Sequence, residues 1–427
     1  MTIKHPSPIF YTFLLLCCLF GNITFAQTSV LKELNENLIE IESVQPNDNF
    51  VNFDQFSKVL TNNKILAIGE VTHGIKEFMA FRVTLIKHLV TKLNYKVIVL
   101  ESDLSGAKLI NDYILYNKGD KYDRIKGLLP IWQNDEFLNL IDWLKSYNLT
   151  QTSENKVKIY GCDMQYTLTA AKIANGSIKL KTEISDDAKK GLAVLKNIFV
   201  KASAQDKELL KKLKAELSEE IAILSDTALS SRSITTVIQS IEWFLTGDWY
   251  KRDIIRDKYM AENVSWIYEY ENKDKMVFLA HNTHIAKKPV YDDVNRAGFY
   301  LKQQYADGYY ALGLSFFTGE FLGTNEKTRK LEVFTIPEIN NERSSEYIFS
   351  QSRTPNFILD FESNMQNPVI KTFLTTDTYS KNIGSSYIKT SKDRKLAYMP
   401  LVDKFDGIGF FRRASAILPG ITSSQKQ

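Results

Sequence analysis

The sequence has few cysteines with which to form disulfide bonds. Only 3 cysteines occur in 427 residues, and two of them, Cys17 and Cys18, lie in an N-terminal apolar run. Removal of that run would leave Cys162 alone, and a single thiol excludes an internal disulfide. We therefore expect the fold to depend on its hydrophobic core, which a composition of 44% hydrophobic and 12% aromatic residues can supply.

The sequence also lacks a large excess of charge of one sign and lacks the common catalytic signatures. The 54 Lys and Arg nearly balance the 50 Asp and Glu, and the absence of a dense basic stretch argues against a nucleic-acid-binding protein. We find no G-x-S-x-G elbow, H-E-x-x-H pair, paired C-x-x-C, P-loop or glycine-rich dinucleotide turn. A conventional serine hydrolase and a zinc-finger site therefore lose support.

The N-terminus has the pattern of a secretory signal peptide over residues 1–26. Lys4 and His5 precede the apolar run Phe10–Phe20, and Ala26 provides a small residue for cleavage. The run is too short for a permanent membrane helix, and large leucines before its cysteines disfavour a lipoprotein anchor. We expect an exported protein, periplasmic or secreted, with no membrane span after cleavage.

The remaining chain, 27–427, is predicted to form one α/β domain with a mainly parallel central sheet flanked by helices. Runs rich in Val, Ile and Leu alternate with helical spacing, which is typical of such a sheet. The predicted strands are 64–69, 96–100, 157–160, 276–280, 309–317 and 407–411. Helical spacing follows the first strand over 78–90, and residues 321–391 give no clear pattern.

A helical insertion is predicted at about 183–235. Lys and Glu become dense there, while leucines and isoleucines keep a three-four spacing, which indicates an amphipathic helix pair. A further long helix is predicted over about 236–270. We expect the insertion to act as a lid, because apolar helix faces over a cleft can bury a bulky ligand.

Polar side chains follow four of the predicted strands. In open α/β sheets ligands bind outside the carboxyl ends of the strands, so these side chains are candidates for one site. The candidates are Glu70 and His73 after the first strand, Glu101 after the second, Asp163 after the third, and His281, Asn282 and His284 after the fourth.

Each candidate also has a purely structural interpretation. A histidine or carboxylate after a strand can serve as a helix cap or a core residue. Arg252 and Asp253 form a pair within a helix that is by default solvated. Cys162 is most simply a small buried hydrophobe, and His88 a structural residue of the 78–90 helix.

Several motifs together resemble the erythromycin esterase family. Their order along the chain is the family's order, which makes the set more specific than any one motif. They are Gly69-Glu70-x-x-His73-Gly74, Glu77-Phe78 with Arg82, Glu101, Trp132-x-Asn134-x-Glu136, Tyr160-Gly161-x-Asp163, Arg252-Asp253 with Met260-Ala261-Glu262-Asn263, Ala280-His281-Asn282-x-His284, and Phe405-Asp406-Gly407.

The resemblance implies hydrolysis of an ester or lactone by activated water, without a bound metal or other cofactor. Neutral imidazole is suited to taking a proton near neutral pH. By position, His73 is the expected general base and Glu70 its support. The other residues expected to line the cleft are Glu101, Arg252, His281 and His284 as catalytic residues and Arg82, Asp163 and Asn282 as substrate-binding residues.

Two other functions remain open from the residues alone. The His and Glu side chains are also suitable ligands for a catalytic metal, which would make the protein a metal-dependent hydrolase. Two histidines near one pocket could instead ligate the iron of haem, in a periplasmic binding protein. The expected partner of the enzyme is a small ester or lactone; export favours a substrate other than a macrolide, because macrolides act on ribosomes inside cells.

Overall fold

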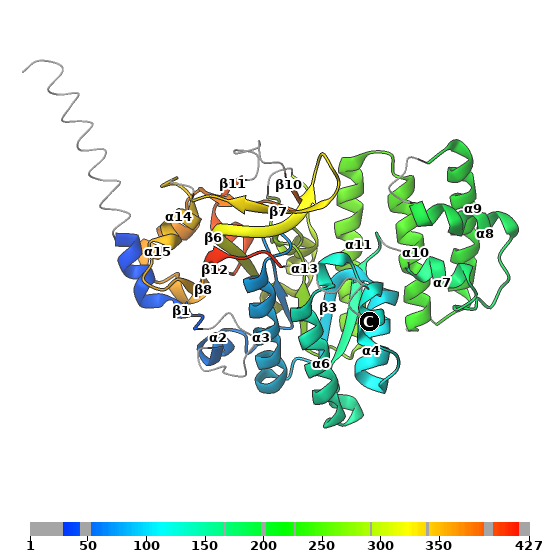
Figure 1. The fold of residues 1–427 in the computed structure, drawn as a ribbon, viewed down its shortest axis with the longest axis horizontal. Helices are drawn as coiled ribbons and strands as arrows, with labels where there is room; N and C mark the ends of the chain where they lie inside the picture. Colours follow the sequence, from blue (N-terminus) through cyan, green and yellow to red (C-terminus); the bar gives the residue numbers. More distant parts are fainter. Residues whose placement is uncertain are drawn as a thin grey trace, which may run out of the picture.

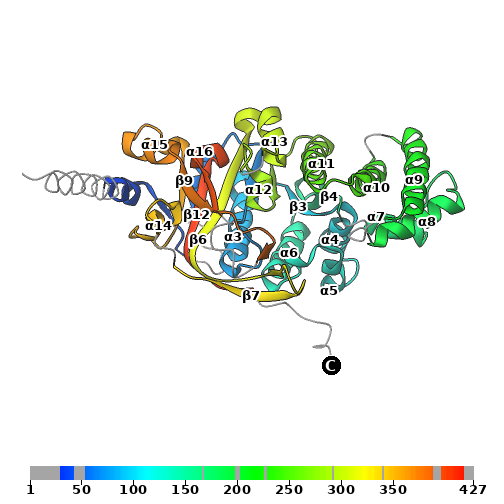
Figure 2. The ribbon, with the colours of Figure 1, turned by 90° about the horizontal axis from the view of Figure 1, so that it is seen from above.

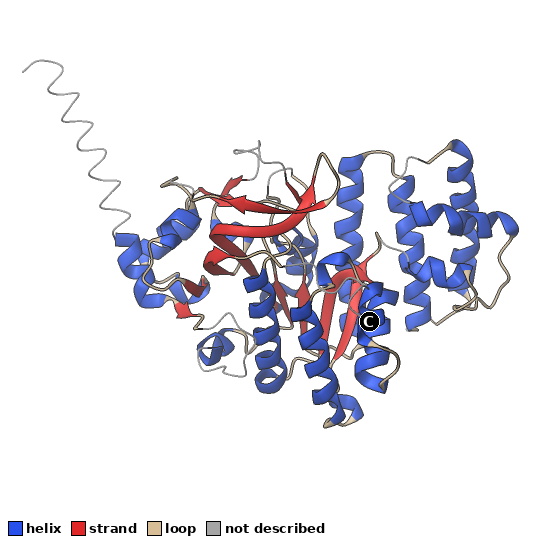
Figure 3. Cartoon of the chain, in the orientation of Figure 1, coloured by secondary structure: helices blue, strands red, loops and turns tan. Residues whose placement is uncertain are grey.

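A computed structural model of the chain describes residues 29–42, 53–165, 168–197, 202–225, 228–290, 293–338, 341–387 and 396–417. The predicted signal peptide, with Cys17 and Cys18, lies outside these residues. A central sheet lies between layers of helices, and a further group of helices stands at one end of the molecule (Figures 1 and 3). The predicted α/β class, with a mostly parallel sheet flanked by helices, is confirmed.

The main sheet is parallel through its centre and antiparallel at one edge. Neighbours from β12 to β4 run parallel, whereas β8 pairs antiparallel with both β12 and β1. In spatial order the strands are β1 (Ile39–Glu40), β8 (Asn356–Asp360), β12 (Gly407–Ala414), β6 (Tyr309–Asn325), β2 (Ile65–Ile68), β5 (Met276–Leu279), β3 (Val97–Asp103) and β4 (Lys158–Asp163). Every predicted strand is therefore present in this sheet.

The segment without a clear pattern contributes to the same architecture. β6 runs beyond the predicted strand and pairs antiparallel with β7 (Leu331–Ile336) and parallel with β10 (Ser386–Tyr387). β9 (Thr378–Lys381) and β11 (Leu396–Met399) form a small antiparallel sheet of their own. Figure 2 shows the extended β6 and β7 passing along one side of the molecule.

Alternating side chains of the strands divide the interior into two cores. In β2, Leu66 and Ile68 face one core, while Ile65 and Ala67 face the other, as the two-residue period of a strand requires. The first core is covered by α2 (Phe53–Val59), α3 (Lys76–Leu93), α4 (Leu104–Tyr116) and α6 (Asp135–Leu149). The second is covered by α11 (Trp249–Tyr270), α13 (Ala297–Tyr305), α14 (Ser345–Ser350), α15 (Pro368–Thr375) and α16 (Leu401–Lys404).

Four helices form a separate unit beside the β4 edge, with a core of their own that includes Leu192, Leu213 and Trp243. These helices are α7 (Leu168–Ala174), α8 (Asp186–Val194), α9 (Ala204–Ala222) and α10 (Leu229–Leu245). The insertion expected at about 183–235 corresponds to the middle of this unit, at the right of Figure 1. None of the helices in the described ranges is long and apolar enough to cross a membrane.

The single helix predicted over 236–270 is wrong, because the chain breaks between α10 and α11. Gly247 lies in the break, and the side chain of Asp248 accepts the N–H of Lys251 as the N-cap of α11. A glycine followed by a capping aspartate ends one helix and starts another. Hydrophobic residues keep a helical spacing on both sides of the break, so the spacing alone does not reveal the break.

Candidate active site

The loop that follows β2 carries a hydrogen-bonded Glu–His pair. Nδ1 of His73 lies 2.8 Å from Oε1 of Glu70. A carboxylate accepts only, so the ring proton is on Nδ1 and the Nε2 lone pair is available. Nε2 forms no hydrogen bond with the part of the chain that the structure describes, and His73 lines a cavity.

Arg82, which α3 places beneath this pair, holds the carboxylate in its charged form. Its Nη1 lies 3.2 Å from Oε1 of Glu70, and its Nη2 donates to the carbonyl oxygens of Ile68 and Ala280. Although burial opposes ionisation, Arg82 and His73 hold the pKa of Glu70 below its ordinary value. Arg82 is fully buried, so it positions Glu70 and cannot contact a substrate.

His281, two residues after the end of β5, links the loops that follow β2 and β5. Its Nδ1 accepts the N–H of Thr283, which places the ring proton on Nε2, where it donates to the carbonyl oxygen of Val71 at 3.0 Å. Burial, with the neighbouring His73 and His284, lowers the pKa of His281 to about 3. This neutral ring lies 5.7 Å from the ring of His73, centre to centre.

His284 lies in a buried ionic cluster. Its Nδ1 is 2.7 Å from Oδ1 of Asp257, whose other oxygen lies 3.2 Å from Nη1 of Arg296. Its Nε2 is 3.4 Å from Oε1 of Glu101. Although burial opposes protonation, Asp257 and Glu101 outweigh it and raise the pKa of His284 to about 9.

Arg256 joins the carboxyl ends of β3 and β4. Its Nη2 lies 2.7 Å from Oε1 of Glu101 and 2.7 Å from Oδ2 of Asp163, and its Nη1 lies 2.9 Å from Nε2 of His284. Although burial opposes ionisation, His284 and Arg256 hold the pKa of Glu101 well below its ordinary value. Three buried carboxyl groups (Glu101, Asp163, Asp257) thus lie against the guanidinium groups of Arg256 and Arg296 and the ring of His284.

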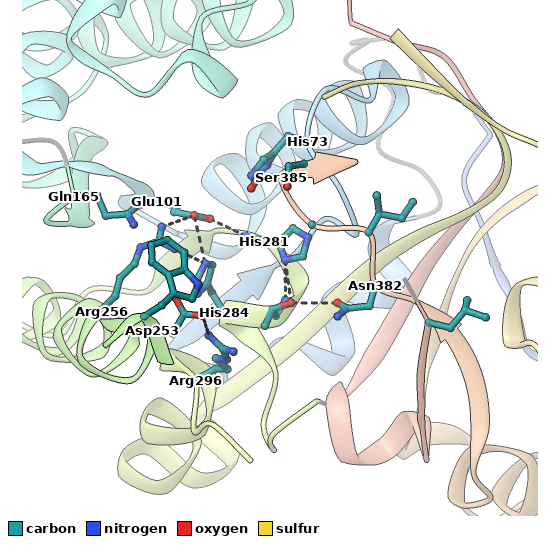
Figure 4. Close-up of a pocket in the computed structure, with 16 residues that line it drawn as sticks. His73, Glu101, Gln165, Asp253, Arg256, His281, His284, Arg296, Asn382 and Ser385 are labelled. Carbon is teal, nitrogen blue, oxygen red and sulfur yellow. Dashed lines mark hydrogen bonds and ion pairs between the residues drawn. The ribbon is translucent and has the colours of Figure 1, made fainter. Parts of the chain in front are cut away.

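His73, Glu101, Arg256, His281 and His284 border one cavity of about 550 Å³, a volume ordinary for a small-molecule site. Figure 4 shows Glu101, Arg256 and His284 pointing toward one another on one side, with His73 and His281 beyond them. The residues that line it are His73, Glu101, Gln165, Trp249, Asp253, Arg256, His281, Thr283, His284, Arg296, residues 382–386 and Leu396.

The segment 382–386 closes the side of the cavity nearest the β2 loop. Thr72 donates its hydroxyl to the carbonyl oxygen of Gly384 at 2.8 Å, and the Gly384 N–H donates to Val71. On the other side, Thr283 donates to the side-chain oxygen of Asn382 at 3.2 Å. The segment is thereby tied to the loops after both β2 and β5.

Of the nine residues proposed from the sequence, His73, Glu101, His281 and His284 line the cavity. Glu70, Arg82 and Asp163 do not line it, but their side chains bind His73, Glu70 and Arg256 respectively. The side chains of Asn282 and Arg252 take no part in this network. Asn282 uses its amide on the backbone of β6, donating to Leu314 at 2.9 Å and accepting from Leu314 at 3.1 Å, and does not line the cavity. Arg252 donates to the carbonyl oxygens of Phe244 and Thr246 at the end of α10. It lies outside the cavity lining, so the structure does not give it the place predicted in the cleft.

The sequence reasoning missed Arg256 and Asp257: Arg256 takes that place in the cleft, and Asp257 holds His284 from behind. They repeat the Arg252-Asp253 dipeptide one helical turn later. Asp257 lies on the buried stripe of α11 with Met260 and Val264. The position of this apolar stripe around the helix could have indicated that Arg256-Asp257, and not Arg252-Asp253, faces the site.

The helical unit also differs from the expected lid. No described residue between 183 and 235 lines the histidine cavity. The ends of α8 and α7 instead line a neighbouring cavity, where Leu192 and Leu195 face Leu128 and Leu129.

The residues of the site do not fit a metal ion or a haem iron as they stand. Both ring nitrogens of His281 are used by backbone groups, and Nδ1 of His284 by Asp257. Arg256 occupies the space beside Glu101 where a cation would have to bind. Among the residues with described positions, no three His, Cys, Asp or Glu side chains are grouped to hold a metal.

Comparison with known proteins gives a consistent result. The sequence model of the erythromycin esterase family matches residues 90–414. An Escherichia coli erythromycin esterase type II is 24% identical over 319 residues, covering 64% of this chain and 74% of that protein.

Two solved structures share the fold. A crystal structure of a succinoglycan biosynthesis protein has a TM-score of 0.79 at 21% identity, covering 91% of this chain and 98% of that one. A mutant of erythromycin esterase EreC in its open conformation has a TM-score of 0.64 at 19% identity, covering 87% and 96%.

Proposed function

The chain belongs to the erythromycin esterase family, and we propose that it is an exported hydrolase that cleaves an ester or lactone with water activated by His73 and Glu70. The observation that carries the proposal is the orientation of His73. Its Nδ1 is held by a buried carboxylate, and its Nε2 is left for the cavity. This is the arrangement of a general base with its orienting acid.

The chemistry follows from these atoms. Nε2 of His73 takes a proton from water as the water oxygen attacks the carbonyl carbon, and ionised Glu70 stabilises the imidazolium that forms. Arg256 lines the same cavity, and the one N–H of its Nη1 that is not directed at His284 can donate to the oxyanion of the tetrahedral intermediate. The imidazolium then returns its proton to the leaving alkoxide. His281 and Glu101 position these groups.

The test is hydrolysis by the purified mature protein. A panel of macrolides, simple lactones and aryl esters is assayed with and without chelator. His73→Ala and Glu70→Gln should each lower kcat by about 10²–10⁴. The melting temperature should stay within a few degrees in His73→Ala and fall by about 4–6 °C in Glu70→Gln, because Arg82 loses its buried partner. His88→Gln, which changes a histidine outside the cavity, is the matched control and should retain activity. Full activity in His73→Ala would end the proposal, and loss of activity with chelator would favour the metal-dependent alternative.

Export is proposed on the N-terminal pattern. Expression of the full chain in a Gram-negative host should give a periplasmic or secreted product whose N-terminus is Gln27. A product in the cytoplasm that retains Met1 would contradict it.

A further inference from the structure

A second cavity of about 510 Å³ lies next to the histidine cavity. Glu101 lines the first cavity and the next residue, Ser102, lines the second, because consecutive residues of a strand face opposite sides. Gln165, two residues beyond the end of β4, lines both. The two cavities therefore lie on either side of the β3 and β4 ends and meet at Gln165.

The lining of the second cavity differs in chemistry from that of the first. The histidine cavity is lined mainly by polar and charged side chains, whereas leucine and alanine make up half of the lining of the second, including Leu128, Leu168, Leu192 and Ala171. Its two cationic residues, Lys126 and Lys196, are exposed. A lining of this kind binds an alkyl group by removing apolar surface from water.

The walls of this cavity come from two parts of the chain. One wall is formed by α7 and α8 of the helical unit, and the other by the connection between α4 and α6. Ser102 fixes that connection to the sheet, because its hydroxyl accepts the N–H of Leu129 at 3.1 Å. The cavity is thus built against the same strand end that carries Glu101.

We propose that the second cavity is the subsite for an apolar arm of the substrate, so that the enzyme acts on an elongated ester with one alkyl end. This inference rests on the proposed function, since it places the scissile carbonyl beside His73. The polar end then occupies the histidine cavity, and the alkyl chain passes Gln165 toward Leu192. The helical unit, which lies beside the reacting groups, would select substrates by the length of their alkyl chain.

The first experiment measures chain-length dependence in the wild-type mature protein. One series varies the acyl chain of p-nitrophenyl esters from acetate to octanoate, and another varies the alcohol of alkyl acetates from ethyl to octyl. We expect kcat/KM to rise about three- to fourfold per added methylene in one of the two series. Flat dependence in both, with acetate hydrolysed, would overturn the inference and leave the proposed function intact.

The second experiment fills the cavity. Ala171 lines it and is partly buried, whereas Ala174 on the same helix is exposed and lies outside the lining. Ala171→Phe should keep acetate turnover within about twofold and lose at least tenfold in kcat/KM for the longest substrate, whereas Ala174→Phe should behave as wild type. Equal losses for short and long substrates in Ala171→Phe would contradict the subsite.

A binding measurement separates the two proposals if no ester is cleaved. Failure to hydrolyse any member of either series, or any macrolide, lactone or aryl ester of the earlier panel, would refute the proposed function. Calorimetric titration with octanoate then tests the cavity by itself: wild type and Ala174→Phe should bind it at least tenfold more tightly than Ala171→Phe. Equal or absent binding in all three would overturn the subsite as well.

Discussion

Arg252 and Arg256 provide a matched pair of substitutions, because they are the same residue type one turn apart on α11. Arg256→Met removes the cation between Glu101 and Asp163 while keeping much of the side-chain volume. Removing one partner of a buried ion pair costs about 3–5 kcal/mol, because the remaining charge is left uncompensated. Arg252→Met removes two hydrogen bonds to backbone carbonyls, which is worth about 1–2 kcal/mol.

These free energies convert to melting temperatures. With an unfolding entropy of about 2.1 cal/mol/K per residue over about 400 residues, Arg256→Met should lower the melting temperature by about 4–6 °C. Arg252→Met should lower it by about 1–2 °C. Differential scanning calorimetry of both variants beside wild type measures the difference directly.

The activities of the two variants should separate further. Arg256 lines the cavity and Arg252 does not, so loss of a donor to the oxyanion should lower kcat by about 10²–10³ in Arg256→Met only. The stability deficit of Arg256→Met should also shrink as the pH falls below about 4.5, because Glu101, left with His284 but without Arg256, has a less depressed pKa than in wild type and loses less stability on acidification. Equal effects of the two substitutions on both stability and kcat would refute this account of the ionic cluster.

Three further predictions test the surroundings of the site. The pKa of His284 is raised to about 9, so its protonation stabilises the fold fully below about pH 6.5, and this stabilisation is lost as the pH rises through 9. Between about pH 6 and 10 the melting temperature should therefore fall more steeply for wild type than for His284→Gln. Parallel curves of melting temperature against pH would contradict the raised pKa. A Cβ at Gly69 would lie 2.0 Å from Oδ1 of Asn282, whereas one at Gly247 would meet no atom within 4 Å. Gly69→Ala should therefore have a lower melting temperature than wild type, and Gly247→Ala should not. Similar melting temperatures for the two variants would contradict this prediction. Burial raises the pKa of Cys162 well above its usual range, so iodoacetamide should leave it unmodified in the folded protein and alkylate it in urea, as intact-mass measurement would show; rapid alkylation of the native protein would contradict its burial.

The sequence predicts the sheet well because the central strands are buried on both faces. Ile65–Ile68 and Met276–Leu279 are fully apolar runs, and such runs indicate parallel strands without information on their neighbours. The strand β8, which lies between β1 and β12, escaped prediction. It is five residues long, and its place is set by antiparallel pairing with β12, which is a long-range contact.

The candidate site was predictable where a functional residue lies at the carboxyl end of a strand or within a few residues after it. His73, Glu101, His281 and His284 share this position, so the carboxyl edge of the sheet brings them together. Residues that reach the site from a helix or a distant loop carry no such signal. Arg256 enters from the middle of α11, and its choice over Arg252 depends on helix phase and on the break at Gly247.

The roles of individual side chains depended on hydrogen-bond partners that a sequence does not contain. Asn282 belongs to the same motif as His281, yet it points to the β6 backbone. The segment 382–386 has no catalytic residue types beyond Asn and Ser. Its position follows from hydrogen bonds to Val71 and Thr72, more than 300 residues away.

The strand order has a consequence for biosynthesis. β5 lies between β2 and β3, although the chain makes β3 and β4 long before it reaches residue 276. Until then β2 and β3 have no shared neighbour, and each presents an open hydrogen-bonding edge. Unpaired edges of this kind invite association with other chains, and late non-local pairing is slow. A nascent chain truncated before β5 should therefore depend on chaperones, and that dependence should end only after β6, which covers the other edge of β2, and β12 have also been made.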